Sequence, residues 1–140
     1  HTFTWRAQLQ SNWVDPQTGQ VKPPIDAFMV VRQTFSRMSL RLLTPESQSD
    51  LLGAEVVRAD DGTYRVFGGY RNEPSLGVRE RSPIHYGGLV LQVIGSPAVR
   101  LTGHYWTDRD TKGEIVLSDR RAAHIDDITA GTDLYAKSAC

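Results

Sequence analysis

Apolar and polar side chains alternate along much of the chain, and this period of two is the feature that most constrains its fold. In residues 3–14 the apolar side chains share one face, at Phe3, Trp5, Ala7, Leu9 and Trp13. Arginine and amide side chains occupy positions between them. Successive side chains of a strand point to opposite sides, so this segment is predicted to be a strand with one face buried.

Alternating or β-rich segments recur along the rest of the chain. Further strands are expected in residues 25–33, 35–43, the two arms of 53–71, 85–95, 99–106 and 114–118. Asp61-Gly62 separates the two arms of 53–71 and is typical of a hairpin turn. The links between the segments are too short for the helical crossovers that join parallel strands. The sheet is therefore predicted to be antiparallel.

This pattern predicts an all-β fold, a small closed antiparallel barrel of about eight strands, because closure leaves no strand edge exposed. A sandwich of two sheets is the alternative. The pairs Gly68-Gly69 and Gly87-Gly88 are expected to mark bends or bulges where a small barrel curls. Side chains or one small ligand fill such a barrel. Bulky residues are expected to point inward, such as Trp5, Leu9, Phe28 or Met29.

The segment TPESQSDLLG, residues 44–53, allows two interpretations. Thr44 can cap a helix, Pro45 suits its first position and Gly53 its end, which favours a short helix capping one end of the barrel. The other interpretation is an extended polar segment whose Ser47 and Ser49 hydroxyls face a ligand. We expect the barrel to span residues 1–120, followed by a C-terminal tail, 121–140, with a weakly helical start and a loose polar end.

Charge and cysteine content narrow the classes of function. The chain of 140 residues has sixteen basic and sixteen acidic residues, which argues against a non-specific binder of DNA or RNA polymers. Thirteen of the basic residues are arginine, whose planar fork suits phosphate or carboxylate. The one cysteine is Cys140, so no intrachain disulfide forms and a reducing compartment fits. No apolar run approaches the roughly 18 residues that span a bilayer.

Catalytic and metal-binding motifs are absent from the sequence. It contains no Cys-x-x-Cys, no His-Glu-x-x-His, no phosphate-binding P-loop and no nucleophile elbow. His85, His104 and His124 lack metal-ligand spacing, and the aspartates around Arg109 suit a turn. We therefore expect neither an enzyme nor a bound cofactor or metal.

Aromatic, amide and arginine groups gather where two strands end. The segment GGYRNEP, residues 68–74, and the segment HYWTDR, residues 104–109, both finish in such groups. Aromatic faces stack on nucleobases, and arginine and threonine side chains hold phosphates. The structural alternative is that the tyrosines and tryptophan fill the core with their polar tips at the rim.

Three motifs carry a resemblance to a known family. They are Thr44-x-Glu46-Ser47-x-Ser49, then Tyr70-Arg71-Asn72-Glu73-Pro74, then Gly103-x-Tyr105-Trp106-Thr107-Asp108-Arg109 with Gly113. From about residue 28 to 120 the chain resembles the β-barrel receptor domain of the two-transmembrane CBASS effectors. These are bacterial antiphage proteins associated with CD-NTase enzymes, and the third motif is the most specific of the three.

The resemblance implies that the barrel recognises a cyclic dinucleotide, which the partner CD-NTase makes on infection. Transmembrane helices N-terminal to the barrel would then assemble and disrupt the bacterial inner membrane. This sequence holds no such helices and begins with His1 rather than Met. We therefore expect the chain to be the cytoplasmic sensor domain of a longer, oligomeric membrane protein.

The ligand is large for the interior of a small barrel, so its site is expected at one mouth or along the outer rim. The groups expected to bind it are Tyr70, Arg71, Asn72, Tyr105, Trp106, Thr107 and Arg109, with Ser47 and Ser49. Tyr105 and Trp106 are neighbours on one strand and point to opposite faces, so one of them is expected to lie in the core. A lipocalin-like carrier of a small apolar ligand and a non-binding assembly module remain alternatives.

Overall fold

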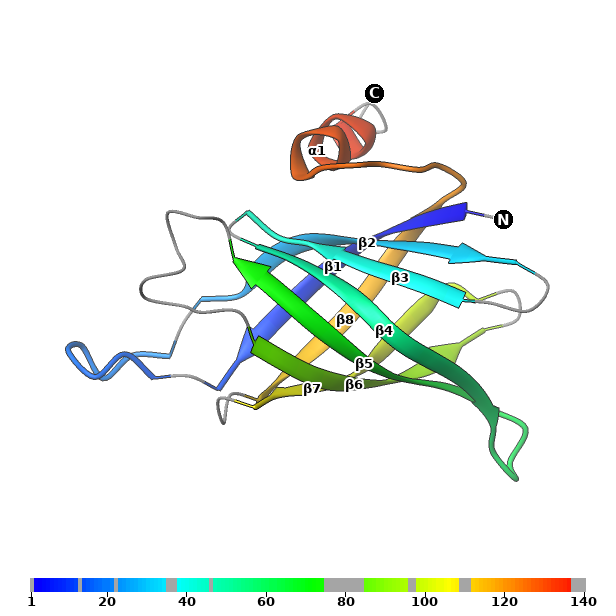
Figure 1. Cartoon of the computed structure of the whole chain (residues 1–140), viewed down its shortest axis with the longest axis horizontal. Coiled ribbons are helices and arrows are strands. Elements are labelled where there is room, and N and C mark those ends of the chain that lie inside the picture. Colours follow the sequence, from blue (N-terminus) through cyan, green and yellow to red (C-terminus); the bar gives the residue numbers. More distant parts are fainter. Residues whose placement is uncertain are drawn as a thin grey trace.

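The alternating segments form eight antiparallel strands in the computed structural model, which describes residues 2–12, 14–21, 23–34, 38–45, 47–74, 85–95, 98–108 and 112–136. The strands are β1 (Thr2–Ser11), β2 (Ile25–Gln33), β3 (Met38–Leu43), β4 (Ser47–Arg58), β5 (Tyr64–Pro74), β6 (His85–Ile94), β7 (Arg100–Thr107) and β8 (Lys112–Arg121). Each strand pairs with the next, and β8 pairs with β1, so the sheet closes into a barrel (Figure 1). The predicted closed barrel is confirmed, and the sandwich is wrong.

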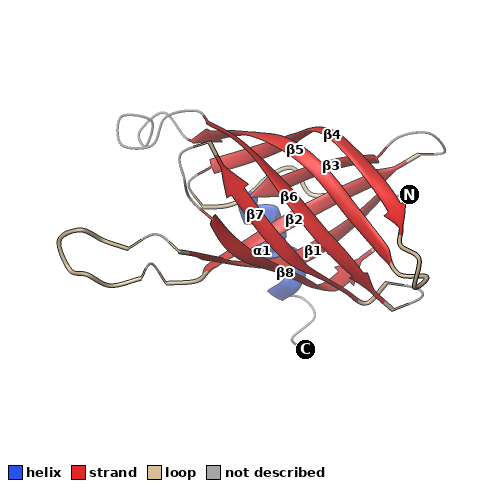
Figure 2. Cartoon of the chain, turned by 90° about the horizontal axis from the view of Figure 1, so that it is seen from below, coloured by secondary structure: helices blue, strands red, loops and turns tan. Residues whose placement is uncertain are grey.

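The strands run obliquely around the barrel, as closure requires (Figure 2). The inward positions of the pleat are filled by buried apolar side chains, at Trp5, Ala7, Leu9, Ala27, Met29, Leu40, Val66, Leu89, Leu91, Leu101, Ile115 and Leu117. Leu91 and Leu117 have no exposed surface. The middle of the barrel is therefore a packed core.

Phe28 was predicted to point inward, and this prediction is wrong. Its neighbour Met29 packs in the barrel core, so the period of two places Phe28 on the outer wall. Phe28 is nevertheless only 9% exposed, because a second hydrophobic cluster covers it together with Val30 and Leu43.

A C-terminal helix, α1 (Ile128–Ala136), forms that cover and lies outside the barrel (Figure 1). Asp127 precedes the helix, and its carboxylate accepts the backbone N–H of Ala130 at 2.7 Å, which is an N-cap. The tail was predicted to be helical at its start and loose at its end, and this placement is wrong: residues 122–127 are not helical, and the helix that follows them packs against the barrel wall.

The helix considered for residues 44–53 is wrong, because the segment is extended from Ser47 onward. Residues from Ser47 onward belong to β4, paired with β3 and β5. The Thr44 hydroxyl does accept a backbone N–H, that of Ser47 at 2.9 Å, but this bond closes the turn between β3 and β4. The capping chemistry of threonine serves a strand connection here.

Tyr135 joins α1 to the wall. Its ring stacks on Phe28 with centroids 5.4 Å apart, and its hydroxyl lies 3.0 Å from the Thr4 carbonyl oxygen and 2.6 Å from that of Asp119. The guanidinium groups of Arg6 and Arg121 lie 4.8 and 4.6 Å from the ring centroid. Burial raises the pKa of Tyr135 to about 12, so the phenol remains a donor at neutral pH.

The two glycine pairs do not mark bulges, contrary to the prediction. The pairing of β5 with β6 runs without a register shift through Gly68-Gly69 and Gly87-Gly88. The register shifts lie instead between Leu51 and Gly53, and between Thr4 and Arg6. At Gly87 and Gly88 the missing side chains make room for aromatic rings of neighbouring strands.

Candidate ligand-binding site

One end of the barrel has a polar inner wall. We call it the site end: the end at which β1, β5 and β7 finish and β4 begins, on the left in Figure 1. The register places most of the predicted ligand-binding residues on the inner face there, namely Ser47, Ser49, Tyr70, Asn72, Tyr105 and Thr107. Segments far apart in the sequence therefore meet at this end of the barrel.

Ser49 and Asn72 form the most buried part of this wall. They are opposite each other on β4 and β5, and are 4% and 9% exposed. The Asn72 amide nitrogen lies 2.6 Å from the Ser49 hydroxyl and 3.1 Å from the Ser47 hydroxyl. Ser47 in turn is linked to Thr44, at 2.8 Å between hydroxyl oxygens. The four side chains form one hydrogen-bonded network.

Tyr70 extends this wall along β5 toward the core. Its ring lies over Gly87, and its hydroxyl is 3.3 Å from the backbone carbonyl oxygen of Trp106. Burial, with the nearby Tyr105 and Asp108, raises the pKa of Tyr70 well above its ordinary value. The phenol therefore stays neutral throughout the physiological range.

Tyr105 reaches the same wall from β7. Its ring lies over Gly113, and its hydroxyl is hydrogen-bonded to the Ser11 side chain. Burial raises the pKa of Tyr105 as well. Ser11 was not among the candidate site residues predicted from the sequence. Ser11 lies two positions after Leu9 in β1, so the alternation indicates that its side chain also points inward.

Arg71 and Trp106 lie on the opposite side of the wall. Arg71 is opposite Asp50 and Tyr86 on the outer face, and Trp106 is 45% exposed with its indole over Gly88. Tyr105 is thus the inward member of the Tyr105-Trp106 pair. The predicted residue Arg109 lies outside the described residues.

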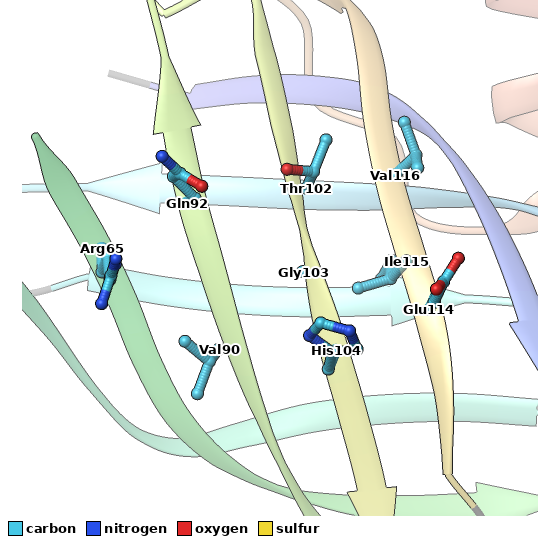
Figure 3. A pocket seen from close by; sticks show the side chains of 9 residues that line it. All are labelled: Arg65, Val90, Gln92, Thr102, Gly103, His104, Glu114, Ile115 and Val116. Atoms are coloured by element: carbon cyan, nitrogen blue, oxygen red, sulfur yellow. The ribbon is translucent and has the colours of Figure 1, made fainter.

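The outer wall carries a separate, open depression of about 370 Å³ (Figure 3). It lies over β5 to β8, and its lining side chains include Arg65, Gln92, Thr102, His104 and Glu114. The depression contains none of the predicted ligand-binding residues. It offers a cation, an imidazole and a carboxylate, in contrast to the neutral inner wall of the site end.

Two other kinds of site have no support among the residues that the structure describes. Within the ranges given above, no three His, Cys, Asp or Glu side chains are grouped as a metal would need. Over the same ranges, no helix has the length and apolarity needed to cross a bilayer.

Fold and site end together define a small closed β-barrel whose core is apolar and whose one end carries hydroxyl, amide and phenol groups on the inner wall. Residues 4–119 match the family described as Cap15, cyclic dinucleotide receptor domain. The match covers most of the 140 residues, so the chain belongs to this family. The resemblance predicted from the three motifs is confirmed. No curated protein matches the chain.

Proposed function

We propose that this chain is a sensor domain that binds a cyclic dinucleotide at the inner wall of the site end. Membership of the Cap15 receptor-domain family is the observation that carries the proposal. The convergence of Ser49, Tyr70, Asn72 and Tyr105 on one inner face supports the location. Hydrogen-bonding groups on an otherwise apolar wall are typical of small-molecule sites.

The proposed role is recognition rather than catalysis. The polar groups of the inner wall are hydroxyls, an amide and phenols, and burial keeps the Tyr70 phenol neutral by raising its pKa. Among the described residues, the hydrogen bonds of Ser47, Ser49 and Tyr70 go to other neutral groups, and none joins them to a histidine or carboxylate of the kind that activates a hydroxyl nucleophile. We expect binding without turnover and without a cofactor.

The wider role that we propose follows the CBASS effectors. A CD-NTase makes the ligand on infection, the sensor binds it, and transmembrane helices outside this chain assemble and disrupt the bacterial inner membrane. In that role the barrel is the cytoplasmic part of a membrane-anchored oligomer that acts in antiphage defence and abortive infection. Family membership supports this proposal.

A carrier of an apolar ligand is less well supported. Such a protein needs an open apolar cavity, but the barrel interior holds large buried side chains, including Met29, Leu91 and Ile115. The interior of an eight-stranded barrel is either filled by side chains or occupied by a ligand. Here apolar side chains fill the middle of the barrel, and the inner wall of the site end is polar.

The test is calorimetric titration of the purified chain with cyclic dinucleotides of adenine, guanine and uracil in every pairing, and with linear dinucleotides as controls. We expect at least one cyclic species to bind with a Kd below about 1 μM, which corresponds to roughly 8 kcal/mol. The linear forms should bind more weakly, because they lose conformational freedom on binding. No heat from any cyclic species, with the chain shown to be folded, would remove the proposal.

Two variants locate the site. Arg109→Ala is expected to abolish binding and leave the fold intact, as the resemblance implies. His104→Ala is the matched control, because His104 lies on β7 next to Tyr105 but lines the outer depression. Loss of affinity in His104→Ala, with no loss in Arg109→Ala, would place the ligand on the outer wall.

A further inference from the structure

The hydrogen bonds between Thr44 and Ser47 fix which of the two side chains donates. The Thr44 hydroxyl oxygen is 3.2 Å from the Ser47 carbonyl oxygen and 2.8 Å from the Ser47 hydroxyl. A carbonyl oxygen only accepts, so both contacts are satisfied when Thr44 donates to that carbonyl and Ser47 donates to Thr44. The Ser47 hydroxyl then has only lone pairs left for Asn72.

This polarity fixes the orientation of the Asn72 amide. The group that faces Ser47 must be a donor, so it is the NH2 group, at 3.1 Å. Its second N–H is directed to the Ser49 hydroxyl at 2.6 Å. A flipped amide would bring its oxygen against the lone pairs of Ser47 and would be repelled. Two serines therefore use both donors of Asn72.

Two hydrogen-bonding functions of this buried pair remain unused. Among the residues that the structure describes, none donates to the Asn72 carbonyl oxygen and none accepts the Ser49 hydroxyl proton. Ser49 and Asn72 are 4% and 9% exposed, so this acceptor and this donor lie on a wall that is largely shielded from solvent. An acceptor and a donor thus stand side by side on the inner wall.

The described side chains around the pair are neutral. By register, the inward positions described at the site end include Ser11, Tyr70, Tyr105 and Thr107, and none of these is charged. A phosphate placed against this wall would lose water without meeting a cation among the described side chains, which is unfavourable. The edge of a nucleobase, in contrast, is neutral and carries a donor next to an acceptor.

We propose that Asn72 and Ser49 read the edge of one nucleobase of the ligand, and that its phosphates lie toward the rim. The Asn72 carbonyl accepts an N–H of the base, and the Ser49 hydroxyl donates to the neighbouring ring nitrogen or carbonyl. This assignment rests on the proposed function, and it makes Asn72 and Ser49 determinants of which base is bound.

The experiment is a thermodynamic cycle on the full chain with the tightest-binding cyclic dinucleotide of the panel. Its base is changed to an analogue without one donor: purine for adenine, hypoxanthine for guanine or N3-methyluracil for uracil. We expect Asn72→Ala to weaken the parent ligand about ten-fold, as loss of one buried hydrogen bond does. Deleting the base donor should weaken wild-type binding by a similar factor. It should cause no further loss of affinity in Asn72→Ala, which lacks the acceptor for that donor.

A phosphate modification provides the comparison. A methyl phosphotriester at one linkage should weaken wild type and Asn72→Ala by the same factor, because the two changes act at separate places. Two results would show that Asn72 does not read the base. One is that deleting the base donor lowers the affinity of Asn72→Ala as much as that of wild type. The other is that the phosphotriester lowers the affinity of wild type but not that of Asn72→Ala. Absence of any wild-type binding would instead remove the proposed function and this assignment with it.

Ser49→Ala is the companion variant, since Asn72→Ala loses two buried hydrogen bonds and its fold must be checked by thermal melting. Ser49→Ala keeps the Asn72 carbonyl and loses the hydroxyl donor. Ser49→Ala should bind the parent ligand more weakly than wild type does. With a deaza or deoxo analogue, which lacks the base acceptor, the two proteins should bind equally well. A loss that persists with each of these analogues would contradict the assignment.

Discussion

Positions without a side chain decide where the aromatic rings of the site end lie. A Cβ at Gly87 would stand 2.6 Å from the Tyr70 ring, and one at Gly113 would stand 2.5 Å from the Tyr105 ring. Both contacts are shorter than packed carbon atoms allow. The two glycines therefore let the tyrosine rings lie across the backbone of neighbouring strands, an arrangement known from edge glycines in β-sheets.

Tyr70 makes the stability of the barrel sensitive to alkaline pH. Burial raises the pKa of its phenol in the folded state above the value of about 10 that applies to the unfolded chain. Stability is therefore complete below pH 10 and falls as the pH rises above it, because only the unfolded state releases the proton. Tyr70→Phe should lose about 1 kcal/mol at pH 7, with its hydrogen bond, and decline less steeply between pH 9 and 11.

Urea unfolding at a series of pH values measures this effect. Tyr64→Phe is the control, because Tyr64 lies on the same strand but is 47% exposed. Its pH profile should follow that of the wild type. An equally steep alkaline decline in Tyr70→Phe and the wild type would show that the Tyr70 phenol is not the group responsible.

The helix α1 stabilises the chain by covering part of the outer wall. It covers Phe28, Val30 and Leu43 on the outer wall, and burial of each such side chain contributes roughly 1.5–3 kcal/mol. The helix approaches the wall at Gly131, where a Cβ would stand 2.6 Å from a ring carbon of Phe28. The approach depends on glycine, although glycine lowers the intrinsic stability of a helix.

Gly131→Ala is therefore expected to destabilise the chain. In an exposed helix this change gains about 1 kcal/mol, but overpacking against the Phe28 ring costs roughly 1–3 kcal/mol. We expect a net loss of about 1 kcal/mol in the free energy of unfolding, measured by urea denaturation. Thr129→Ala, an exposed position of the same helix, should be neutral or slightly stabilising. A gain in stability in Gly131→Ala would show that α1 does not press on Phe28.

At the scale of the whole molecule, the sequence predicted the barrel because every strand carries the period of two. It also predicted most of the site end, because strand ends rich in polar and aromatic groups were matched to family motifs. The alternation of side chains predicted that Tyr105 and Trp106 would lie on opposite faces, but it did not predict which of them is inward, nor that Arg71 would lie on the outer face. Which face is inward depends on registers with partner strands, which are distant in the sequence.

The local sequence did not predict the position of the helix, for a different reason. Residues 44–53 have helix-capping residues but lie between two partner strands, and pairing on both sides overrides the local preference. Residues 128–136 have weak helical character but an apolar wall to cover. Tertiary packing decided both cases.

The site end and α1 approach each other most closely in the sequence at Leu43 and Thr44. Leu43 packs under α1, and Thr44 belongs to the network that holds Asn72. Their side chains act on opposite faces of the wall, and coupling would require an element with two arrangements that both sites bias. We therefore expect ligand binding to be independent of the packing of α1.

Thermal melting with and without ligand tests this independence. At a ligand concentration of about 100 times Kd, binding should stabilise the wild type by about 2.7 kcal/mol, which raises Tm by roughly 10 °C. Gly131→Ala should melt earlier without ligand but show the same increment. A clearly smaller rise in Tm on ligand binding would mean that the packing of α1 against the wall affects the Thr44 network. The helix would then regulate the sensor.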